Sequence, residues 1–193
     1  MITGVRDRVR FLRSFLAHPR QVGAVLPTSR RAVRTMLDMG DLPRADVVVE
    51  LGAGTGVYTE EILARLKPGA RLLAFEIDRN LAAGISARLR DPRLEVVADS
   101  AEKVDAYLAG AQADVMVSAL PYTSLPASVR TAVLDTSAKV LAPGGTMLVL
   151  QYSPMVLGEL RRRWPDVRRS ICLVNVPPAW LFACRAGAAG GRR

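Results

Sequence analysis

The stretch that most constrains the fold of this 193-residue chain covers residues 46–66. It begins with a short β-branched run, 46–51, typical of a strand that helices cover on both faces. Gly52, Gly54 and Gly56 follow, and they allow a tight turn and the close approach of a ligand to bare backbone. An amphipathic helix is expected over the rest of the stretch. Together these elements predict a ligand pocket at the carboxyl end of a strand, where open α/β sheets bind small molecules.

Strands and helices alternate through the middle of the chain. Further buried strands are expected at 71–76, 94–98, 114–118 and 146–151, and helical patterns separate them. The turn into the last of these strands is expected at Pro143, Gly144 and Gly145. This alternation predicts βαβ units, and therefore an α/β fold with a mostly parallel sheet and helices on both faces.

Two apolar runs close the chain, at 170–176 and 179–185. Only Pro177 and Pro178 separate them, which is too short for a parallel crossover. The two runs therefore predict an antiparallel hairpin. Residues 187–193, rich in glycine and arginine, show no pattern and are expected to form a frayed tail.

The N-terminal segment, residues 2–16, predicts a basic amphipathic helix. Its apolar residues recur at a spacing of three and four, and arginines fill the other positions. Such a helix can lie in a lipid interface, or it can pack on its own domain with a solvated arginine face. His18 and Pro19 end it, and Thr28 or Ser29 is expected to cap a second helix that runs to Leu37.

The net charge of +9 is unevenly distributed. Residues 1–40 carry +6, residues 41–150 carry −3, and residues 151–193 carry +6. Basic ends around a mildly acidic body indicate a polyanionic partner, either nucleic acid or an anionic membrane surface.

No apolar run approaches the ~20 residues that cross a bilayer, so a soluble or peripheral protein is expected. Cys172 and Cys184 lie in apolar runs and are expected in the core, and no Cys/His cluster predicts a metal.

An acidic residue lies at the end of three successive predicted strands. Glu50 precedes the first glycine by two positions, Glu76 closes the second strand, and Asp99 with Ser100 follows the third. An acid after the second strand suits the two ribose hydroxyls of a nucleoside, and one after the third can hold an adenine amino group. Nicotinamide-dependent enzymes share the glycine loop, whereas three acids at three strand ends are far more specific.

These features resemble the class I S-adenosylmethionine-dependent methyltransferases over about residues 28–186. The resemblance implies a Rossmann-like fold, with a seven-stranded, mostly parallel sheet, an antiparallel C-terminal hairpin and an extra N-terminal amphipathic helix. It implies that Glu50 helps to hold the amino group of S-adenosylmethionine, that Glu76 binds the ribose and that Asp99 binds the adenine. The cofactor-binding residues that it implies are Glu50, Gly52, Ala53, Gly54, Gly56, Glu76, Ile77, Asp99, Ser100 and Ala119.

Residues 118–122, Ser-Ala-Leu-Pro-Tyr, resemble the motif of methyltransferases that modify nitrogen. In that motif a polar residue, a proline and an aromatic residue present carbonyl groups and a ring to the acceptor amine. The nearest spelling is the Asn-Leu-Pro-Tyr of the ribosomal RNA adenine dimethyltransferases, which contact adenine through the asparagine. Here Ala119 holds that position and offers no hydrogen-bonding side chain. Those enzymes also carry a C-terminal helical domain, and no such domain is predicted after the hairpin.

Three segments, 11–37, 50–63 and 118–126, are instead similar to the bacterial phospholipid N-methyltransferases. This family makes phosphatidylcholine from phosphatidylethanolamine, and the resemblance implies methylation of that lipid and of its mono- and dimethyl forms. It also implies peripheral attachment to the inner face of the cytoplasmic membrane through residues 2–16, which favours the interfacial interpretation of that helix. The chain would then divide into a lipid-side segment, 1–27, a methyltransferase domain, 28–186, and the tail.

Tyr122 is the predicted catalytic residue, because its ring can shape the site of the amine and of the charge that returns with each methyl group. Arg20 and Arg30 are predicted phosphate ligands, since they flank the loop and helix start nearest the glycine pocket. His18, the single histidine, is a candidate general base, but its place before a proline at a helix end favours a structural role. Tyr58, Tyr152 and Trp180 are unranked candidates for the lining. The predicted substrate-binding residues are Arg20, Arg30, Ser118, Leu120, Pro121 and Tyr122.

Three other interpretations stay open. An RNA adenine N6-methyltransferase would use the positive charge equally well, although Ala119 and the missing domain disfavour nucleic acid, and another small amine is a further acceptor. A binding protein whose cofactor pocket has lost its chemistry is the alternative from another class. The full set of Glu50, Glu76 and Asp99 argues against it, because a pocket without a cofactor has no physical need for all three.

Overall fold

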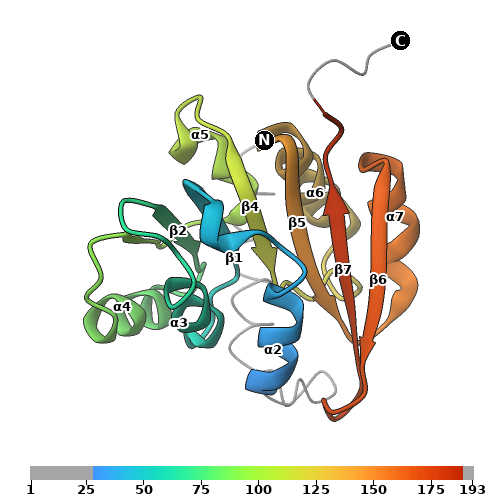
Figure 1. Cartoon of the computed structure of the whole chain (residues 1–193), viewed down its shortest axis with the longest axis horizontal. Coiled ribbons are helices and arrows are strands. Elements are labelled where there is room, and N and C mark those ends of the chain that lie inside the picture. The colour runs from blue at the N-terminus through green and yellow to red at the C-terminus, as the bar shows by residue number, and fades with distance from the viewer. Residues whose placement is uncertain (1–27, 189–193) are drawn as a thin grey trace.

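The computed structural model describes residues 28–188, which form one seven-stranded sheet with helices on both faces (Figure 1). The strand order is β3-β2-β1-β4-β5-β7-β6. Neighbouring strands from β3 to β5 are parallel, and β7 runs antiparallel to both β5 and β6. The predicted helix over 2–16, together with His18 and Arg20, lies outside the described residues, and so do residues 189–193.

The elements follow the alternation that the sequence predicts. The strands are β1 (Val47–Leu51), β2 (Arg71–Phe75), β3 (Leu94–Val97), β4 (Ala113–Ser118), β5 (Leu141–Gln151), β6 (Asp166–Cys172) and β7 (Ala179–Arg185). The α-helices are α2 (Arg30–Leu37), α3 (Val57–Leu63), α4 (Arg79–Arg88), α5 (Val104–Leu108), α6 (Ala127–Val140) and α7 (Leu157–Arg163). Short 3-10 turns are η1 (Leu42–Arg44), η2 (Ala101–Lys103) and η3 (Pro154–Val156).

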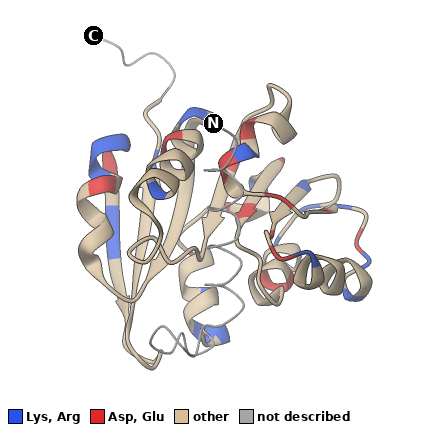
Figure 2. Ribbon diagram, turned by 180° about the vertical axis from the view of Figure 1, so that it is seen from behind, with Lys and Arg blue, Asp and Glu red and all other residues tan. Residues whose placement is uncertain are grey.

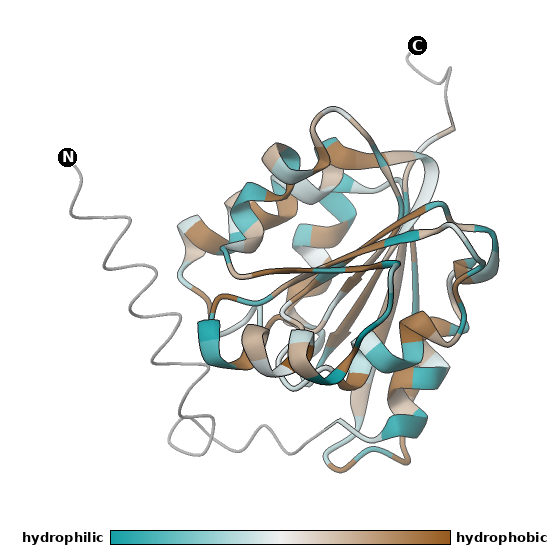
Figure 3. Cartoon of the chain, turned by 90° about the vertical axis from the view of Figure 1, so that its left-hand side faces the viewer, coloured by the Kyte–Doolittle hydropathy of each residue, from teal (hydrophilic) through white to brown (hydrophobic). Residues whose placement is uncertain are grey.

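The sheet is apolar on both faces because helices cover both. Helices α2, α3 and α4 lie on one face and α5, α6 and α7 on the other (Figures 1 and 3). Successive strand side chains point to opposite faces, so Val48 and Val49 of β1 belong to two different buried clusters. Cys172 and Cys184 are both buried and free, as predicted.

Local sequence signals account for the helix starts. The hydroxyl of Ser29 accepts the backbone N–H of Ala32 and caps α2, as predicted. Asp78 caps α4 in the same way, through the backbone N–H groups of Asn80 and Leu81. These caps place both helix N-termini at the edge of the sheet where the parallel strands end.

The start of β5 differs from the prediction. The strand begins at Leu141 rather than Thr146, and its pairing with β4 jumps from Ala113↔Leu141 to Val115↔Thr146. Residues 142–145 therefore form a bulge inside the strand instead of the predicted turn before it. Gly145 is required there, because a Cβ atom would lie 2.8 Å from the carbonyl oxygen of Ala142. Close backbone contact therefore requires a glycine at 145, whereas Gly144 has a φ of 75° and no atom within 4 Å of a Cβ position.

Two absences concern the described part of the chain. Across residues 28–188, no helix has both the length and the apolar character needed to cross a membrane. Within the same residues, no three His, Cys, Asp or Glu side chains are grouped so that they could hold a metal ion.

Candidate active site

The loops after β1, β2, β3 and β4 line one narrow pocket at the carboxyl edge of the sheet. Five of the predicted cofactor residues line it: Gly52, Glu76, Ile77, Asp99 and Ser100. The opposite wall is apolar and comes from the loop after β4 and from α6: Leu120, Leu125, Val129 and Val133. A pocket with carboxylates on one side and a hydrocarbon wall on the other suits a flat, polar-edged ring such as a nucleobase.

The glycine loop holds its backbone close to neighbouring strands. Gly52, Gly54 and Gly56 have φ values of 80°, 57° and 84°, in the left-handed region that favours glycine. A Cβ atom on Gly52 would lie 2.7 Å from Cδ2 of Leu120, whereas one on Gly54 would meet no atom within 4 Å. The backbone N–H groups of Gly52 and Ala53 donate to the carbonyl oxygen of Phe75 at 2.9 Å each. The loop is therefore packed underneath and open above Gly54.

Glu50 does not line this pocket, but it is the most unusual of the predicted cofactor residues. Its side chain is buried, and Oε2 accepts a hydrogen bond from the Thr59 hydroxyl at 2.7 Å. The other oxygen, Oε1, has no hydrogen-bond partner among the described residues. Burial raises the pKa of Glu50 to about 7, although the bond from Thr59 opposes that rise. A buried carboxylate oxygen without a donor is what the amino group of a bound ligand would satisfy.

Glu76 is also buried, but the protein satisfies both of its oxygens. Oε2 accepts the N–H of Gly54 at 2.7 Å and Oε1 accepts the N–H of Asp78 at 2.9 Å. Burial raises its pKa, and these backbone bonds work against the increase. Each carboxylate oxygen has a second lone pair, so Glu76 can still accept hydroxyl groups from a ligand. Its position ties the glycine loop to the end of β2.

Asp99 is held from three directions. Its carboxylate accepts the backbone N–H of Ser100 at 2.7 Å, the Tyr107 hydroxyl at 3.0 Å and Nζ of Lys103 at 3.0 Å. Burial alone would raise the pKa of Asp99, but these three donors lower it below its usual value. The carboxylate therefore stays ionised and fixed at the rim of the pocket.

The loop after β4 turns its aromatic residue inward. Tyr122 has no exposed surface, and its hydroxyl lies 2.9 Å from that of Ser118, which is equally buried. Burial raises the pKa of Tyr122. Nε2 of Gln151 donates to the carbonyl oxygen of Leu120 at 2.7 Å and fixes the loop from β5. The structure thus buries Tyr122 beneath the predicted acceptor loop, where it supports the loop.

Ala119 lies at the β1 side of this loop. The sequence predicts that it contacts the cofactor, and it holds the position at which an asparagine contacts adenine in the RNA enzymes. Its backbone N–H donates to the carbonyl oxygen of Leu51 at 3.4 Å, and its methyl group packs against the buried cluster under α2 and α3. No side-chain donor or acceptor is therefore present at this point of the loop.

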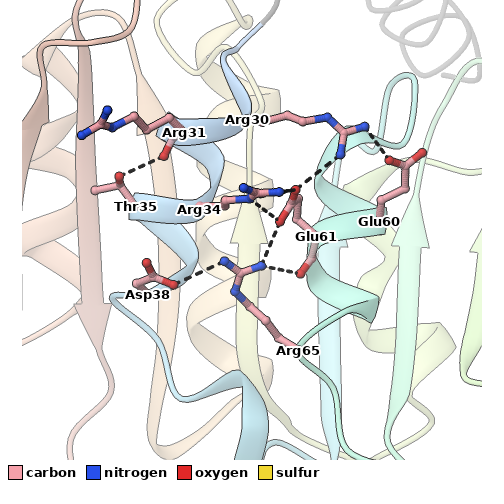
Figure 4. A network of polar contacts seen from close by, with 8 residues as sticks. All are labelled: Arg30, Arg31, Arg34, Thr35, Asp38, Glu60, Glu61 and Arg65. Carbon is pink, nitrogen blue, oxygen red and sulfur yellow. Dashed lines mark hydrogen bonds and ion pairs between the residues drawn. The ribbon is translucent and has the colours of Figure 1, made fainter.

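Arg30 lies in the first turn of α2 and is engaged by two carboxylates (Figure 4). Nη2 lies 2.9 Å from Oε2 of Glu60, and Nη1 lies 3.4 Å from Oε1 of Glu61. Glu61 is also paired with Arg34 and Arg65, at 2.9 and 3.0 Å. The hydrogen bond from Arg34 is the main cause that lowers the pKa of Glu61 to about 2. This network joins α2 to α3, the helix that follows the glycine loop.

Sequence reasoning missed several groups around Glu50. Thr59 is its hydrogen-bond donor, and the buried Tyr58 hydroxyl has no hydrogen-bond partner among the described residues. Tyr152 places its hydroxyl 3.2 Å from that of Thr28, beside the start of α2. From the sequence alone, Tyr58 and Tyr152 are unranked candidates, and Thr59 and Gln151 are not singled out. The usable signal is their position, within three residues of the glycine loop or at the end of β5.

Comparisons with known proteins are consistent with this geometry. A sequence profile of the family described as methyltransferase domain matches residues 48–145. The ornithine lipid N-methyltransferase of Singulisphaera acidiphila is 31% identical over 94% of this chain and 97% of its own. Ribosomal RNA small subunit methyltransferase A of Thermotoga maritima is 36% identical, but over 53% of this chain and 35% of its own length.

The fold has close structural neighbours. The N-methyltransferase NodS from Bradyrhizobium japonicum WM9, solved in complex with S-adenosyl-L-homocysteine, superposes with a TM-score of 0.72. It shares 18% identity, and the match covers 93% of this chain and 98% of that one. A similarity at this level of identity supports the arrangement of the strands and helices.

Proposed function

This chain belongs to the class I S-adenosylmethionine-dependent methyltransferases and acts on nitrogen, and from this premise we propose that its acceptor is the primary amine of phosphatidylethanolamine at a membrane surface. We choose a lipid acceptor because of how much of each relative's length matches this chain. The match to a lipid N-methyltransferase spans nearly all of both chains, whereas the match to ribosomal RNA methyltransferase A covers about a third of that enzyme. Successive transfers to the mono- and dimethyl forms would lead toward phosphatidylcholine.

The described residues fit the cofactor. The Oε1 atom of Glu50, which has no hydrogen-bond partner among the described residues, would accept the amino group of the methionine part. Glu76 would accept the ribose hydroxyls, while Asp99 and Ser100 would hold the adenine against the wall of Leu120, Leu125, Val129 and Val133. S-adenosylmethionine supplies, when bound, a methyl group on a positively charged sulfur.

The acceptor would lie over the loop of residues 118–122. Backbone carbonyls of this loop would orient the amine, with Tyr122 and Ser118 holding the loop rigid from below. Leu120 and Pro121 offer an apolar surface, which excludes water and lowers the pKa of an ammonium group so that it loses its proton. Holding a neutral amine in line with the methyl donor is the chief catalytic contribution required of the protein.

The lipid phosphate would bind near the start of α2, with Arg30 as the described ligand and Arg20 as the other. Arg30 already contacts Glu60 and Glu61, so a phosphate would compete with these carboxylates for its guanidinium. Arg34 and Arg65 remain on Glu61 when Arg30 moves, which would keep the α2–α3 contact intact. We place the protein at the inner face of the cytoplasmic membrane as a peripheral protein, with 1–27 as its lipid-side segment.

A second acceptor has a specific observation in its favour. The similar lipid enzyme is named for ornithine lipid, so an amine-bearing lipid without phosphate is the alternative within the same mechanism. An RNA adenine acceptor is disfavoured by Ala119, which offers no side-chain hydrogen bond where the adenine-specific enzymes use asparagine.

The test incubates purified full-length protein with methyl-labelled S-adenosylmethionine and one acceptor at a time. The acceptors are vesicles containing phosphatidylethanolamine, vesicles containing ornithine lipid, and ribosomal RNA. We expect label in phosphatidylethanolamine and its methylated products. Label in ornithine lipid alone would move the assignment to that headgroup, and label in RNA alone would overturn the lipid acceptor.

A further inference from the structure

The hairpin between β6 and β7 carries an exposed apolar tip. Residues 173–178 form the turn, and within it Leu173, Val174 and Val176 are 75%, 53% and 73% exposed. Ile171, at the end of β6, is 44% exposed. These are four of the five large apolar side chains that the described residues leave in solvent. A cluster of this kind on a small protein marks an interaction surface.

The tip is held in place rather than loosely tethered. Asn175, at its centre, is buried, and Oδ1 accepts the backbone N–H of Ser29 at 2.9 Å. Its Nδ2 donates to the carbonyl oxygen of Pro177 at 2.8 Å. One polar side chain therefore turns inward and fastens the tip to the start of α2, while its neighbours point outward. The hydrogen bonds of Asn175 therefore hold the apolar side chains of the tip in a fixed position.

The topology puts this tip at the active-site edge. Gln151, the last residue of β5, pairs with Trp180, and Cys172 pairs with Ala179. Because β7 runs antiparallel to β5, the turn before β7 emerges where β5 and the other parallel strands end. Figure 1 shows β6 and β7 converging at the bottom of the molecule, on the side toward which β4 runs. A partner that binds the tip would therefore face the mouth of the candidate site.

The charge around the tip is positive. Residues 167–188 contain no Asp or Glu. Arg169 lies over the ring of Trp180 at 5.8 Å, and Arg31, in the first turn of α2, forms no salt bridge among the described residues. Figure 4 shows Arg31 pointing away from the carboxylates that hold Arg30, and in Figure 2 the ribbon is blue at basic residues of β6 and of α2. Exposed apolar side chains with flanking arginines match the chemistry of an anionic lipid interface.

We propose that the tip, residues 171–178, inserts its apolar side chains into an anionic bilayer and turns the carboxyl edge of the sheet toward the lipid. This membrane contact is separate from residues 2–16, and it rests on the proposed lipid substrate for its biological purpose. The arginines lie against phosphates while Leu173, Val174 and Val176 enter the acyl boundary. Docking at this edge brings a headgroup to the start of α2, where Ser29 is bonded to the tip.

The test measures binding of the full-length protein to vesicles that contain no amine acceptor, so it does not depend on catalysis. The vesicles are phosphatidylglycerol mixed with phosphatidylcholine, and the variant combines Leu173→Ser, Val174→Ser and Val176→Ser. Because all three side chains are exposed, the fold and the affinity for S-adenosylhomocysteine should not change. We expect vesicle partitioning to fall by at least about tenfold, whereas unchanged partitioning would overturn the proposal.

A second measurement reports insertion directly. Leu173→Cys carries an environment-sensitive dye, which the buried Cys172 and Cys184 do not take up. The control is Gln112→Cys, exposed on the loop before β4 at the opposite edge of the sheet. Vesicles should shift the emission of the dye at 173 to the blue and leave that at 112 unchanged. If vesicles shift the emission of the dye at neither position, insertion of the tip is overturned.

Two further outcomes separate this proposal from others. A serine variant that changes the molar mass in light scattering, with unchanged vesicle binding, would make the tip a contact between copies of the chain and overturn the lipid assignment. If the serine variant methylates vesicle lipid at the wild-type rate, that result would also contradict membrane insertion of the tip. If the wild-type protein methylates no lipid, the proposed function fails, but the vesicle binding still decides the proposal for the tip.

Discussion

At the ends of β1, β2 and β3, carboxylates line the site and the protein itself positions each of them, whereas the ends of β5 and β7 offer aromatic, apolar and basic groups. On the first side, Glu76 and Asp99 are held by backbone N–H groups, a lysine and a tyrosine. The second side presents the rings of Tyr152 and Trp180 and the apolar hairpin tip, which Asn175 fastens to Ser29. The first side holds its polar groups in fixed positions, and the second is the side on which we propose that the acceptor binds.

Substitution of Glu76, on the first side, should have the largest effect on cofactor binding. Glu76→Gln puts an amide nitrogen against a backbone donor, either Gly54 or Asp78, and removes the charge that would accept ribose hydroxyls. Loss of charged hydrogen bonds at ~2–3 kcal/mol corresponds to about 100-fold weaker binding of S-adenosylhomocysteine. Calorimetric titration measures it. The control is Glu95→Gln, an exposed carboxylate on β3 paired with Arg71, and equal affinity in both variants would contradict the assignment of Glu76.

The two sides of the site are joined through Glu61, which connects α2 to α3. Glu61→Gln removes three arginine contacts and should lower the free energy of unfolding by about 2 kcal/mol at neutral pH, between the values for exposed and buried pairs. The pKa of Glu61 is lowered from 4.5 to about 2, so its contribution is present above pH 4.5 and is lost as the pH falls toward 2.

Urea unfolding of both proteins across this pH range measures the effect. The wild type and the variant should differ at pH 7 and converge near pH 2. A difference that does not depend on pH would mean that the loss comes from packing, and no difference at pH 7 would show that α2 and α3 are held by apolar contacts alone. Glu95→Gln again serves as the exposed control.

The ionisation of Glu50 should make the affinity for the cofactor product depend on pH. Its pKa is raised to about 7, so the free protein carries a neutral acid below pH 7, and the proton must leave before an ammonium group can pair with it. Affinity for S-adenosylhomocysteine should therefore be about tenfold lower at pH 6 than at pH 8 and nearly flat above pH 8. Calorimetry at each pH measures it. Persistence of the slope in Glu50→Gln would assign the titration to another group.

Tyr122 tests the acceptor side with the smallest expected effect. Tyr122→Phe removes the bond to Ser118 and should cost about 1 kcal/mol of unfolding free energy, with cofactor affinity unchanged. Thermal denaturation and the methyl-transfer assay together measure it. Activity should fall only slightly if the tyrosine supports the loop. A large fall in kcat with unchanged stability would instead mean that the hydroxyl reaches the acceptor.

The sequence predicted the cofactor side well because its signals are local. A β-branched strand, the glycines and an acid at each strand end lie within short windows, so 46–66 and the acids Glu76 and Asp99 were placed correctly at one edge. The hairpin and the caps of α2 and α4 follow from equally local turn and capping signals.

The rest depends on contacts between distant residues. The inward turn of Tyr122, the bulge at residues 142–145 and the clustering of three arginines on Glu61 are decided by neighbours far along the chain. The bond between Ser29 and Asn175 joins residues 146 apart in sequence. No local pattern specifies such pairs, since their spacing is set by the way the sheet brings its edges together.

The position of β7 between β5 and β6 has a consequence for biosynthesis. The groups that form the cofactor pocket have all left the ribosome once α6 has emerged, because they come from residues 50–133. One edge of β5, however, keeps its N–H and C=O groups unpaired until residues 179–185 insert beside it. Until that strand pairs, the nascent chain exposes an aggregation-prone sheet edge, even though every residue of the pocket has already been synthesised.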